Sequence, residues 1–382
     1  MLGNLRSGSL TGAMAMLLIV AVVGAGCGGS SDTSTTKSAS GSGEANASLK
    51  GQGKELALFT MTASNVYGAN QIAGAKKMAK KLGYKIKVFQ NNFSQPQQDQ
   101  EVQQYVASGA KPAASIIFPW VADAAVNSIR QLSRIGPVIL ITQQPNKQQE
   151  PYVKAYAGAN QQLIGEVAAQ MLLKARDQAR KDGMKFHSPQ GNLFVFQHPQ
   201  GEKTGVERWK GFQRATASKP FKVIGTQYGA NSPETGYSIG SQVVPRIKGK
   251  VDFLYVSNQQ AANGIIRALK ENGMQPGKDV ILVSSDCSGS LQAVQNGQTF
   301  GTGLQSGAIE GELGVVTAAQ YVATGKVQGA VQQYKPSPET PQFKVKPPAK
   351  LNYMPHAAAI GPKGINGTSI WGYSAQEICA GG

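Results

Sequence analysis

Short apolar runs alternate with amphipathic stretches through the first half of the chain. Runs of strand length occupy residues 55–61, 85–89, 114–118 and 137–142. Between them, apolar and small residues recur at the spacing of one helix face near 71–82, 98–108 and 121–135. Apolar strands separated by helices of this length predict βαβ units and a parallel sheet covered on both faces.

The same alternation resumes in the second half of the chain. A long helix is expected at 161–181, and strands follow at 192–196, 221–226, 252–256 and 279–285. Two doubly wound α/β lobes account for both series. Ligands of such sheets bind at the carboxyl ends of the strands. The loops at those ends begin at Thr62, Pro119, Gln143, His198, Tyr228, Asn258 and Asp286.

The N-terminal segment, residues 1–26, has the organisation of a secretory signal peptide. Arg6 is the only charged residue before Asp32, and 13–25 is apolar apart from one glycine. This run is short for a membrane span, which takes about 20 residues, whereas a basic start followed by a short apolar core is typical of a signal peptide. The stretch ending at Cys27 resembles the lipobox of bacterial lipoproteins, with glycine where the lipobox has leucine. We expect cleavage after residue 26 and a lipid on Cys27; a plain secreted protein or an uncleaved anchor is the alternative.

Two further segments are poor in the residues that build a core. Residues 28–53 contain no aromatic or β-branched aliphatic residue, which predicts a flexible tether that starts at the lipidated cysteine. Its reach is roughly 25–30 Å. The chain beyond Lys335 is rich in proline and glycine, so we expect little regular structure in most of it and treat 346–382 as a tail.

Composition and charge describe an exported globular protein. The chain is 41% hydrophobic and 15% charged, and its formal net charge is +17. Such a charge would suit nucleic acid or an anionic surface, but export removes nucleic acid as a partner. The basic residues are scattered. The densest group, Lys76, Lys77, Lys80 and Lys81, has helical spacing and predicts a solvated helix face.

The cysteines and histidines offer little reactive chemistry. With Cys27 lipidated, Cys287 and Cys379 are a candidate disulfide in an oxidising compartment, and two unpaired thiols are the alternative. The histidines, at 187, 198 and 356, stand alone, without metal-ligand spacing. We therefore expect no metal, no cofactor and no enzymatic activity.

Several stretches occur in the order found in one family of two-lobed proteins. They are TASNVYGANQIAGAKKMAKKLGY (62–84), IGPVILIT (135–142), ERWKGF (207–212), VSNQQAANGIIRALKENG (256–273) and VSSDCS (283–288). With them, residues 54–335 resemble the type I periplasmic binding proteins of the ribose- and galactose-binding group. The resemblance implies two doubly wound parallel-sheet lobes joined by a three-segment hinge.

The resemblance also places the lobes and the hinge along the chain. The N-terminal lobe would comprise 54–159 and 305–332, and the C-terminal lobe 160–304 and 333–345. The chain would cross between the lobes near 158–160, 304–306 and 332–334.

Matching the family's ligand-binding motifs selects residues from both lobes. The matches are Asn65 and Tyr67 in the first loop, Asn258 and Asp286 in the second lobe, and Gln305 in the hinge. Carboxamides donate and accept hydrogen bonds, a carboxylate accepts from hydroxyls, and a tyrosine ring stacks on a sugar face.

The chain departs from the ribose-binding pattern at three positions. Thr142 and Gln143 replace an Asp-Arg pair, Val206 replaces an arginine with Arg208 as a weaker substitute, and Phe118 replaces an asparagine, with Trp120 nearby. A buried polar group without a partner costs about 1–3 kcal/mol, so a site made for ribose would not lose these groups. We expect Phe118, Trp120, Gln143 and Arg208 to line a site for a ligand with fewer hydroxyls or with a planar face.

The resulting functional hypothesis is a monomeric, lipid-anchored extracytoplasmic binding protein. It would deliver a small polar solute, foremost a sugar, to an ABC permease and its ATPase. The alternative is a sensor for a nucleoside, furanone or other planar solute that signals to a membrane receptor.

Overall fold

The computed structural model describes residues 49–200, 202–327, 334–335, 350–354, 356–370 and 372–380. The predicted signal peptide, Cys27 and most of the tether lie outside these ranges. Within them, no helix combines the length and apolarity that crossing a bilayer requires.

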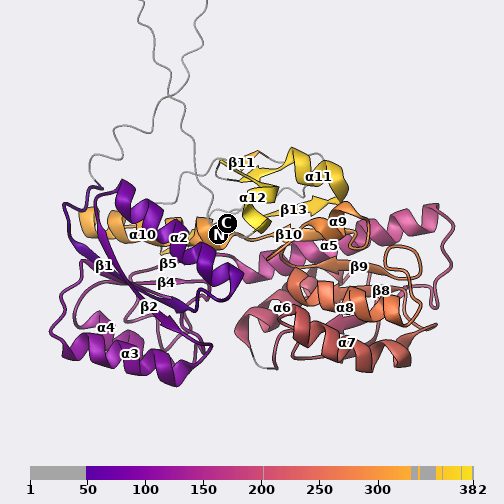
Figure 1. Ribbon diagram of the computed structural model, residues 1–382, viewed down its shortest axis with the longest axis horizontal. Helices are drawn as coiled ribbons and strands as arrows, with labels where there is room; N and C mark the ends of the chain where they lie inside the picture. Colours follow the sequence, from indigo (N-terminus) through magenta and orange to yellow (C-terminus); the bar gives the residue numbers. More distant parts are fainter. Residues whose placement is uncertain are drawn as a thin grey trace, which may run out of the picture. The chain divides into compact units, whose positions relative to one another are not determined.

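The first lobe is built on a six-stranded parallel sheet with the order β12-β5-β4-β3-β1-β2 (Figure 1). Its strands are β1 (Glu55–Met61), β2 (Lys85–Asn91), β3 (Ala114–Ile117), β4 (Val138–Ile141), β5 (Ala155–Gly158) and β12 (Leu351–Tyr353). Its helices are α2 (Val66–Lys81), α3 (Gln95–Ala107), α4 (Val126–Ser133) and α10 (Gly307–Thr324). Side chains of successive strand residues lie on opposite faces of the sheet. Ile116 packs with α2 and α10, whereas Ile117 packs with α3 and α4.

The second lobe repeats this plan with the strand order β13-β10-β9-β8-β6-β7. Its strands are β6 (Asn192–Phe196), β7 (Lys222–Gln227), β8 (Phe253–Val256), β9 (Ile281–Ser284), β10 (Gly301–Leu304) and β13 (Ala357–Ile360), of which β13 is antiparallel. Helices α5 (Gln161–Lys181) and α6 (Lys203–Thr216) cover one face. Helices α7 (Pro233–Ile247) and α8 (Gln259–Glu271) cover the other, and α9 (Gln292–Gln295) is a single turn. The predicted fold of two parallel-sheet α/β lobes is confirmed.

The chain passes between the two sheets at three described places. It leaves the first sheet after β5 and returns after β10, close to the predicted crossings at 158–160 and 304–306. The chain also passes from β12 of the first sheet to β13 of the second, and the described residues that flank this passage are Met354 and His356. The third crossing was expected at 332–334, where only Tyr334 lies within the described residues.

The expectation of little regular structure beyond Lys335 is wrong for the described residues. Besides β12 and β13, this part forms α11 (Gly361–Gly367), α12 (Ala375–Ala380) and a small antiparallel sheet. The strands of that sheet are β11 (Tyr334–Lys335), β14 (Ser369–Ile370) and β15 (Tyr373–Ser374). Strand β12 continues the first sheet by pairing with β5, a partner from a distant part of the sequence.

The C-terminal segment, defined here as residues 356–380, is attached to both lobes. Cys379 forms a disulfide with Cys287, which follows β9 in the second lobe. Tyr373 donates a 2.6 Å hydrogen bond to Glu312 of α10, and Lys77 of α2 lies 3.0 Å from the same carboxylate. The segment therefore joins the second lobe covalently and the first through a polar cluster.

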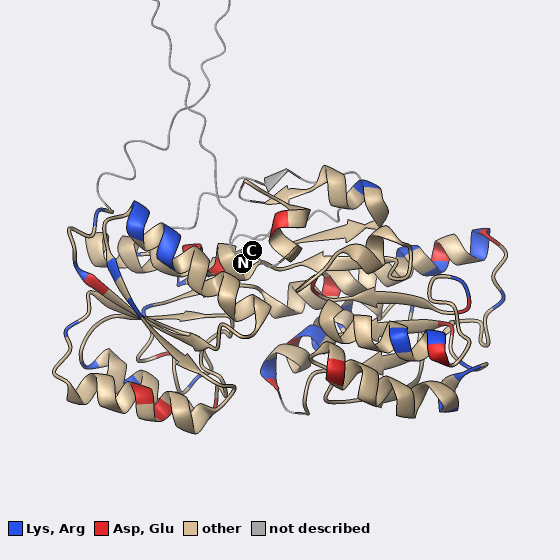
Figure 2. Ribbon diagram, in the orientation of Figure 1, with Lys and Arg blue, Asp and Glu red and all other residues tan. Residues whose placement is uncertain are grey.

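The basic residues remain dispersed in three dimensions. Lys and Arg are spread over helices and loops of both lobes (Figure 2). Lys76, Lys77, Lys80 and Lys81 are all exposed on α2, so the predicted solvated helix face is confirmed.

Candidate functional site

A cavity of about 140 Å³ lies where the strand-end loops of the two lobes meet. All the predicted binding residues except Gln143 line it: Asn65, Tyr67, Phe118, Trp120, Arg208, Asn258, Asp286 and Gln305. These residues come from loops after β1, β3, β8 and β9, from the first turn of α2, from α6 and from the hinge. The topology therefore collects residues far apart in the sequence at the carboxyl ends of the strands.

One wall of the cavity is aromatic and belongs to the first lobe. The ring centroid of Trp120 lies 5.9 Å from that of Phe118 and 5.2 Å from that of Phe93. Gln98 fixes this loop, because its side chain donates to the Phe118 carbonyl (2.8 Å) and accepts from the Trp120 amide (3.3 Å). Phe93 is 43% exposed and adopts φ = 56°. Phe93, Phe118 and Trp120 together give this side of the cavity an aromatic lining.

The opposite wall is polar and is organised around the buried guanidinium of Arg208. Arg208 Nη1 donates to Asp286 Oδ2 and to the Ser257 carbonyl, both at 2.6 Å. Its Nη2 donates to Gln305 (2.6 Å), and its Nε donates to Gln161 (2.9 Å). A charge-assisted network of this kind holds donors and acceptors in fixed positions.

Packing of α5 against α6 sets the position of Arg208. A Cβ atom at Gly165 of α5 would lie 1.8 Å from the Arg208 carbonyl oxygen, and one at Gly211 of α6 would lie 1.9 Å from the Gln162 carbonyl. Only glycine permits this approach of the two helix backbones. The approach brings the Arg208 guanidinium within reach of Gln161 and the hinge.

A second hydrogen-bonded group continues this network into the first lobe. Gln305 Nε2 donates to the Tyr67 hydroxyl (2.8 Å), which in turn donates to the buried carboxylate of Glu310 (2.7 Å). Glu310 also accepts from Gln71 (2.7 Å) and from both the amide (3.0 Å) and the hydroxyl (2.6 Å) of Thr142. Burial raises the pKa of Glu310. The pKa of Tyr67 is also raised, mainly by burial and in addition by the nearby charge of Glu310. A continuous chain of hydrogen bonds thus runs from Asp286 in the second lobe to Glu310 in the first.

Asn65 and Asn258 line the cavity, and each also caps the N-terminus of a helix. The Asn65 carboxamide accepts from the amides of Tyr67 (2.9 Å) and Gly68 (3.2 Å) at the start of α2. The Asn258 carboxamide accepts from the Ala261 amide (2.7 Å) at the start of α8. These caps fix the oxygen of each side chain in place.

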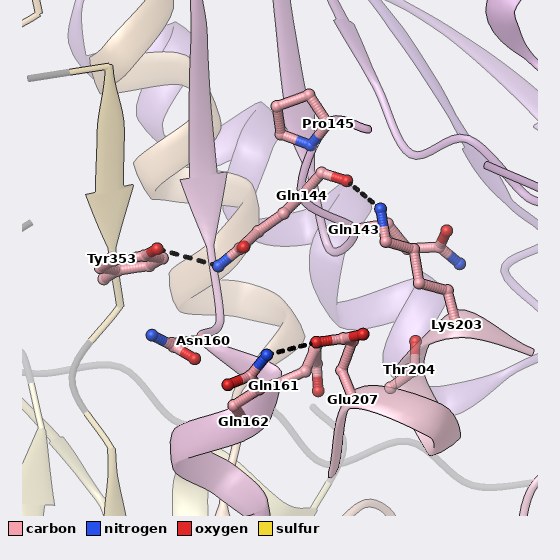
Figure 3. Close-up of a pocket in the computed structure, with 10 residues that line it drawn as sticks. All are labelled: Gln143, Gln144, Pro145, Asn160, Gln161, Gln162, Lys203, Thr204, Glu207 and Tyr353. Atoms are coloured by element: carbon pink, nitrogen blue, oxygen red, sulfur yellow. Dashed lines mark hydrogen bonds between the residues drawn. The ribbon is translucent and has the colours of Figure 1, made fainter. Parts of the chain in front are cut away.

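The structure does not place Gln143 in this cavity. Thr142 lines it, whereas Gln143 lines a neighbouring cavity of about 330 Å³ (Figure 3). Thr142 has φ = 64°, a left-handed conformation that is strained for a β-branched residue. Its bonds to Glu310 hold this conformation, which turns the next side chain away. Val206 is 40% exposed on α6, while Arg208, two residues later, lines the cavity.

Sequence reasoning missed several residues of the cavity. The missed polar residues are Thr142, His198, Glu202, Thr204, Asn231, Gln260 and Ser288, and the missed apolar ones are Met61, Phe93 and Pro199. His198 is the first residue of a strand-end loop, and this position alone could have identified it as a candidate binding residue. The loop after β2, which carries Phe93, did not stand out because β2 is a partly exposed edge strand.

His198 and Glu202 form a pair at the rim of the polar wall. His198 Nδ1 lies 3.3 Å from Glu202, and its buried Nε2 has no hydrogen-bond partner among the described residues. Burial raises the pKa of Glu202, but the charge and hydrogen bond of His198, with donors from Thr204 and Gly205, outweigh it and hold the pKa at about 2. Glu202 is therefore a carboxylate at neutral pH.

This arrangement suits binding rather than bond-breaking. In the described part of the chain, no group of His, Cys, Asp and Glu side chains could hold a metal ion. Arg208 and Asp286 are engaged with each other, and no serine or cysteine in the cavity is hydrogen-bonded to a histidine in the described contacts. Fixed donors and acceptors face a set of aromatic rings across a small cavity.

Comparison with known proteins places the chain in a family. Residues 56–326 match the family described as periplasmic binding protein domain. The ribose import binding protein of Escherichia coli (strain K12) is 26% identical over 275 residues, which cover 72% of this chain and 86% of that protein. The galactofuranose-binding protein of the same strain is 26% identical over 216 residues, covering 56% of this chain and 64% of that protein.

Solved structures share the fold at lower sequence identity. A periplasmic ribose ABC transporter protein from Conexibacter woesei has a TM-score of 0.64 and 19% identity, with coverage of 81% of this chain and 93% of that one. The matched relatives are binding proteins, which confirms the resemblance and the expectation of a binding protein rather than an enzyme. The chain belongs to the periplasmic binding protein family.

Proposed function

We propose that this protein is the extracytoplasmic sugar-binding component of an ABC importer. The observation that carries the proposal is the cavity between the lobes, with aromatic rings on one wall and Arg208, Asp286 and Asn258 on the other. A sugar ring has apolar C–H faces that stack on aromatic rings and hydroxyl edges that need fixed donors and acceptors. The names of the relatives, which include proteins for ribose and galactofuranose, support a sugar.

The size and lining of the cavity narrow the class of sugar. Its volume of about 140 Å³ is below the roughly 300 Å³ at which pockets for drug-sized ligands begin. Phe118 and Trp120 stand on the first-lobe side, where Asn65 supplies a carboxamide. We therefore favour a single sugar ring in this cavity, with hydroxyls directed at the second lobe and an apolar face against the rings.

A planar solute is the second candidate ligand. The contacts of Trp120 with Phe93 and Phe118 are what favour it, because clustered rings also stack on a nucleoside base or a furanone. A sensor that signals to a membrane receptor would use the same closed complex. A neighbouring permease and ATPase gene would support import, and a neighbouring histidine kinase gene would support sensing.

A thermal-shift screen of the purified chain tests the proposed ligand class. Pentoses, hexoses, polyols, nucleosides and amino acids would be compared at equal concentrations. A ligand at 100 times its dissociation constant adds about 2.7 kcal/mol to the free energy of unfolding. We expect a shift with a sugar; a shift only with a heterocycle would replace the first candidate by the second.

We further propose that Cys27 carries the lipid anchor. The support comes from the sequence: a basic start, a short apolar run and Gly24–Cys27 at its end. Radiolabelled palmitate fed to expressing bacteria should label the protein and should not label Cys27→Ala. Equal labelling of the two, or labelling of neither, would contradict the anchor without bearing on sugar binding.

A further inference from the structure

A second cavity lies beside the ligand cavity and is also lined by both lobes. It has a volume of about 330 Å³ (Figure 3). The first lobe contributes Gln143 and Tyr353, and the second lobe contributes Lys203 and Glu207 of α6. Lys203 Nζ crosses between the lobes and donates to the carbonyl of Gln144 (2.7 Å).

The two cavities share their boundary. Thr204 lines both, and the consecutive residues Thr142 and Gln143 line one cavity each. Gln161 lies between them: its Oε1 accepts from Arg208 (2.9 Å), and its Nε2 donates to the Thr142 carbonyl (3.2 Å). Thr204 and Gln161 therefore form the boundary that a molecule occupying both cavities would cross.

One residue that lines the second cavity, Gln143, has a buried polar atom without a partner among the described residues. Gln143 is 3% exposed, and its Oε1 has no hydrogen-bond partner in the described part of the chain. A buried carboxamide oxygen left in this state costs about 1–3 kcal/mol. A rotation of the Gln143 side chain toward a hydroxyl donor in the cavity would give this oxygen a partner and remove the cost.

The remaining lining favours a neutral hydroxylated group. Lys203 and Glu207 contribute one charge of each sign to the lining. Both charges are already engaged, because Glu207 pairs with the exposed Lys210 (2.8 Å) and Lys203 donates to the Gln144 carbonyl. Gln162 already donates to Glu207 (2.6 Å), and Gln144 already donates to the Tyr353 hydroxyl (3.0 Å). These bonds fix the acceptors, and Tyr353 adds an aromatic ring at the edge of the cavity.

We propose that the two cavities are subsites of one ligand site and that the preferred ligand is a disaccharide or glycoside. One sugar ring occupies the aromatic cavity, and the second unit occupies the cavity lined by Gln143 and Lys203. This inference rests on the proposed sugar-binding function and specifies its substrate class.

Isothermal titration calorimetry of the full chain in detergent tests this inference. The probes are monosaccharides and the disaccharides that contain them. We expect the best disaccharide to bind at least about tenfold more tightly than its component monosaccharide, the change expected for one or two added hydrogen bonds. Gln143→Ala should lower disaccharide affinity by about tenfold and leave monosaccharide affinity within about twofold.

Controls separate loss of the subsite from loss of the fold. Gln148→Ala changes an exposed glutamine of the same loop and should leave both affinities unchanged. Lys203→Ala provides a second test from the other lobe, and circular dichroism melting shows whether each variant is folded. Equal affinity for monosaccharides and disaccharides would overturn the inference and leave the proposed function standing. Binding of no sugar would contradict the proposed function and the inference with it.

Discussion

At the scale of single residues, the ligand cavity depends on an ion pair that is almost completely buried. Arg208 and Asp286 lie 2.6 Å apart, with side chains 3% and 8% exposed. Removing one partner of such a pair leaves the other charge unpaired, which costs more than the pair contributes. Asp286 therefore supports the fold in addition to the ligand-binding role proposed for it.

Substitution of Asp286 should separate these two roles. We expect Asp286→Ala to weaken sugar binding by more than about tenfold and to lower the free energy of unfolding by about 3–5 kcal/mol, because Arg208 loses its buried partner. Asn258→Ala should weaken binding while costing only about 1 kcal/mol, the value of one helix cap. Urea unfolding and calorimetry measure both quantities. Unchanged binding in both variants would show that the ligand lies elsewhere.

His356 provides a residue-scale test of pH dependence. It directly precedes β13, and its Nε2 accepts from the Asn160 amide (2.9 Å). Burial, and then the charge of Arg208, lower its pKa from 6.5 to about 3. The unfolded chain therefore takes up a proton at this position before the folded chain does. Stability from this group is complete above pH 6.5 and is lost as the pH falls toward 3.

We expect the free energy of unfolding to fall by about 2–3 kcal/mol between pH 6.5 and pH 4.5 because of His356, at about 1.4 kcal/mol per pH unit. His356→Gln keeps an acceptor for the Asn160 amide but does not titrate. Its stability should therefore be flatter over this interval in urea unfolding at each pH. A parallel loss in the variant and the wild type would assign the effect to other groups.

The position of the Gln143 side chain could not be predicted by matching the sequence to a family pattern. Matching along the chain correctly located the loop after β4, because strand ends follow from apolar patterning. It could not foresee that Thr142 adopts φ = 64°. That conformation depends on Glu310, which is distant in sequence and adjacent only in the fold. A single left-handed residue then sends the next side chain into a different cavity.

At the scale of secondary-structure elements, the main strands and helices were predictable and the C-terminal elements were not. Strands such as β1 and β9 are buried apolar runs, which can be recognised from their own residues alone. Strands β12 and β13 are short and are stabilised by pairing with β5 and β10. Because these partners are distant in sequence, the residues of β12 and β13 alone do not predict a strand. Proline and glycine around them made the region look irregular.

The disulfide of the C-terminal segment should contribute strongly to stability. Cys287 and Cys379 are separated by 92 residues, and closing a loop of this length stabilises by about 4–5 kcal/mol in the chain-entropy account. We expect the double variant Cys287→Ser, Cys379→Ser to lose a large part of this amount in urea unfolding. Dithiothreitol should destabilise the wild type and leave the double variant unchanged. Equal sensitivity of the two proteins would exclude a role for the disulfide.

At the scale of the whole described molecule, one polar network joins the two lobes through the hinge. Asp286, Arg208, Gln305, Tyr67 and Glu310 are linked in that order by hydrogen bonds of 2.6–2.8 Å. A ligand that contacts both walls adds to the bonds across the hinge. If the lobes also adopt a more open arrangement, such a ligand would favour the arrangement in which both walls contact it, by its differential affinity for that arrangement.

We expect a saturating sugar to reduce the radius of gyration measured by small-angle X-ray scattering. Trp120→Ala should not show the reduction at the same ligand concentration, because it removes the central ring of the aromatic wall. Trp209→Phe is a matched control, since Trp209 packs against Phe212 in the second lobe, away from the cavity lining. A compaction that persists in Trp120→Ala would argue against this wall as the ligand contact.

We propose that a sugar binds between the aromatic wall and the Arg208–Asp286 pair. The decisive experiment is a crystal structure of the protein with the sugar that gives the largest thermal shift. We expect a sugar ring face on Trp120 or Phe118, with its hydroxyls hydrogen-bonded to Asp286 and Asn258. Electron density for the sugar at any other place on the chain, with this cavity containing only water, would contradict it.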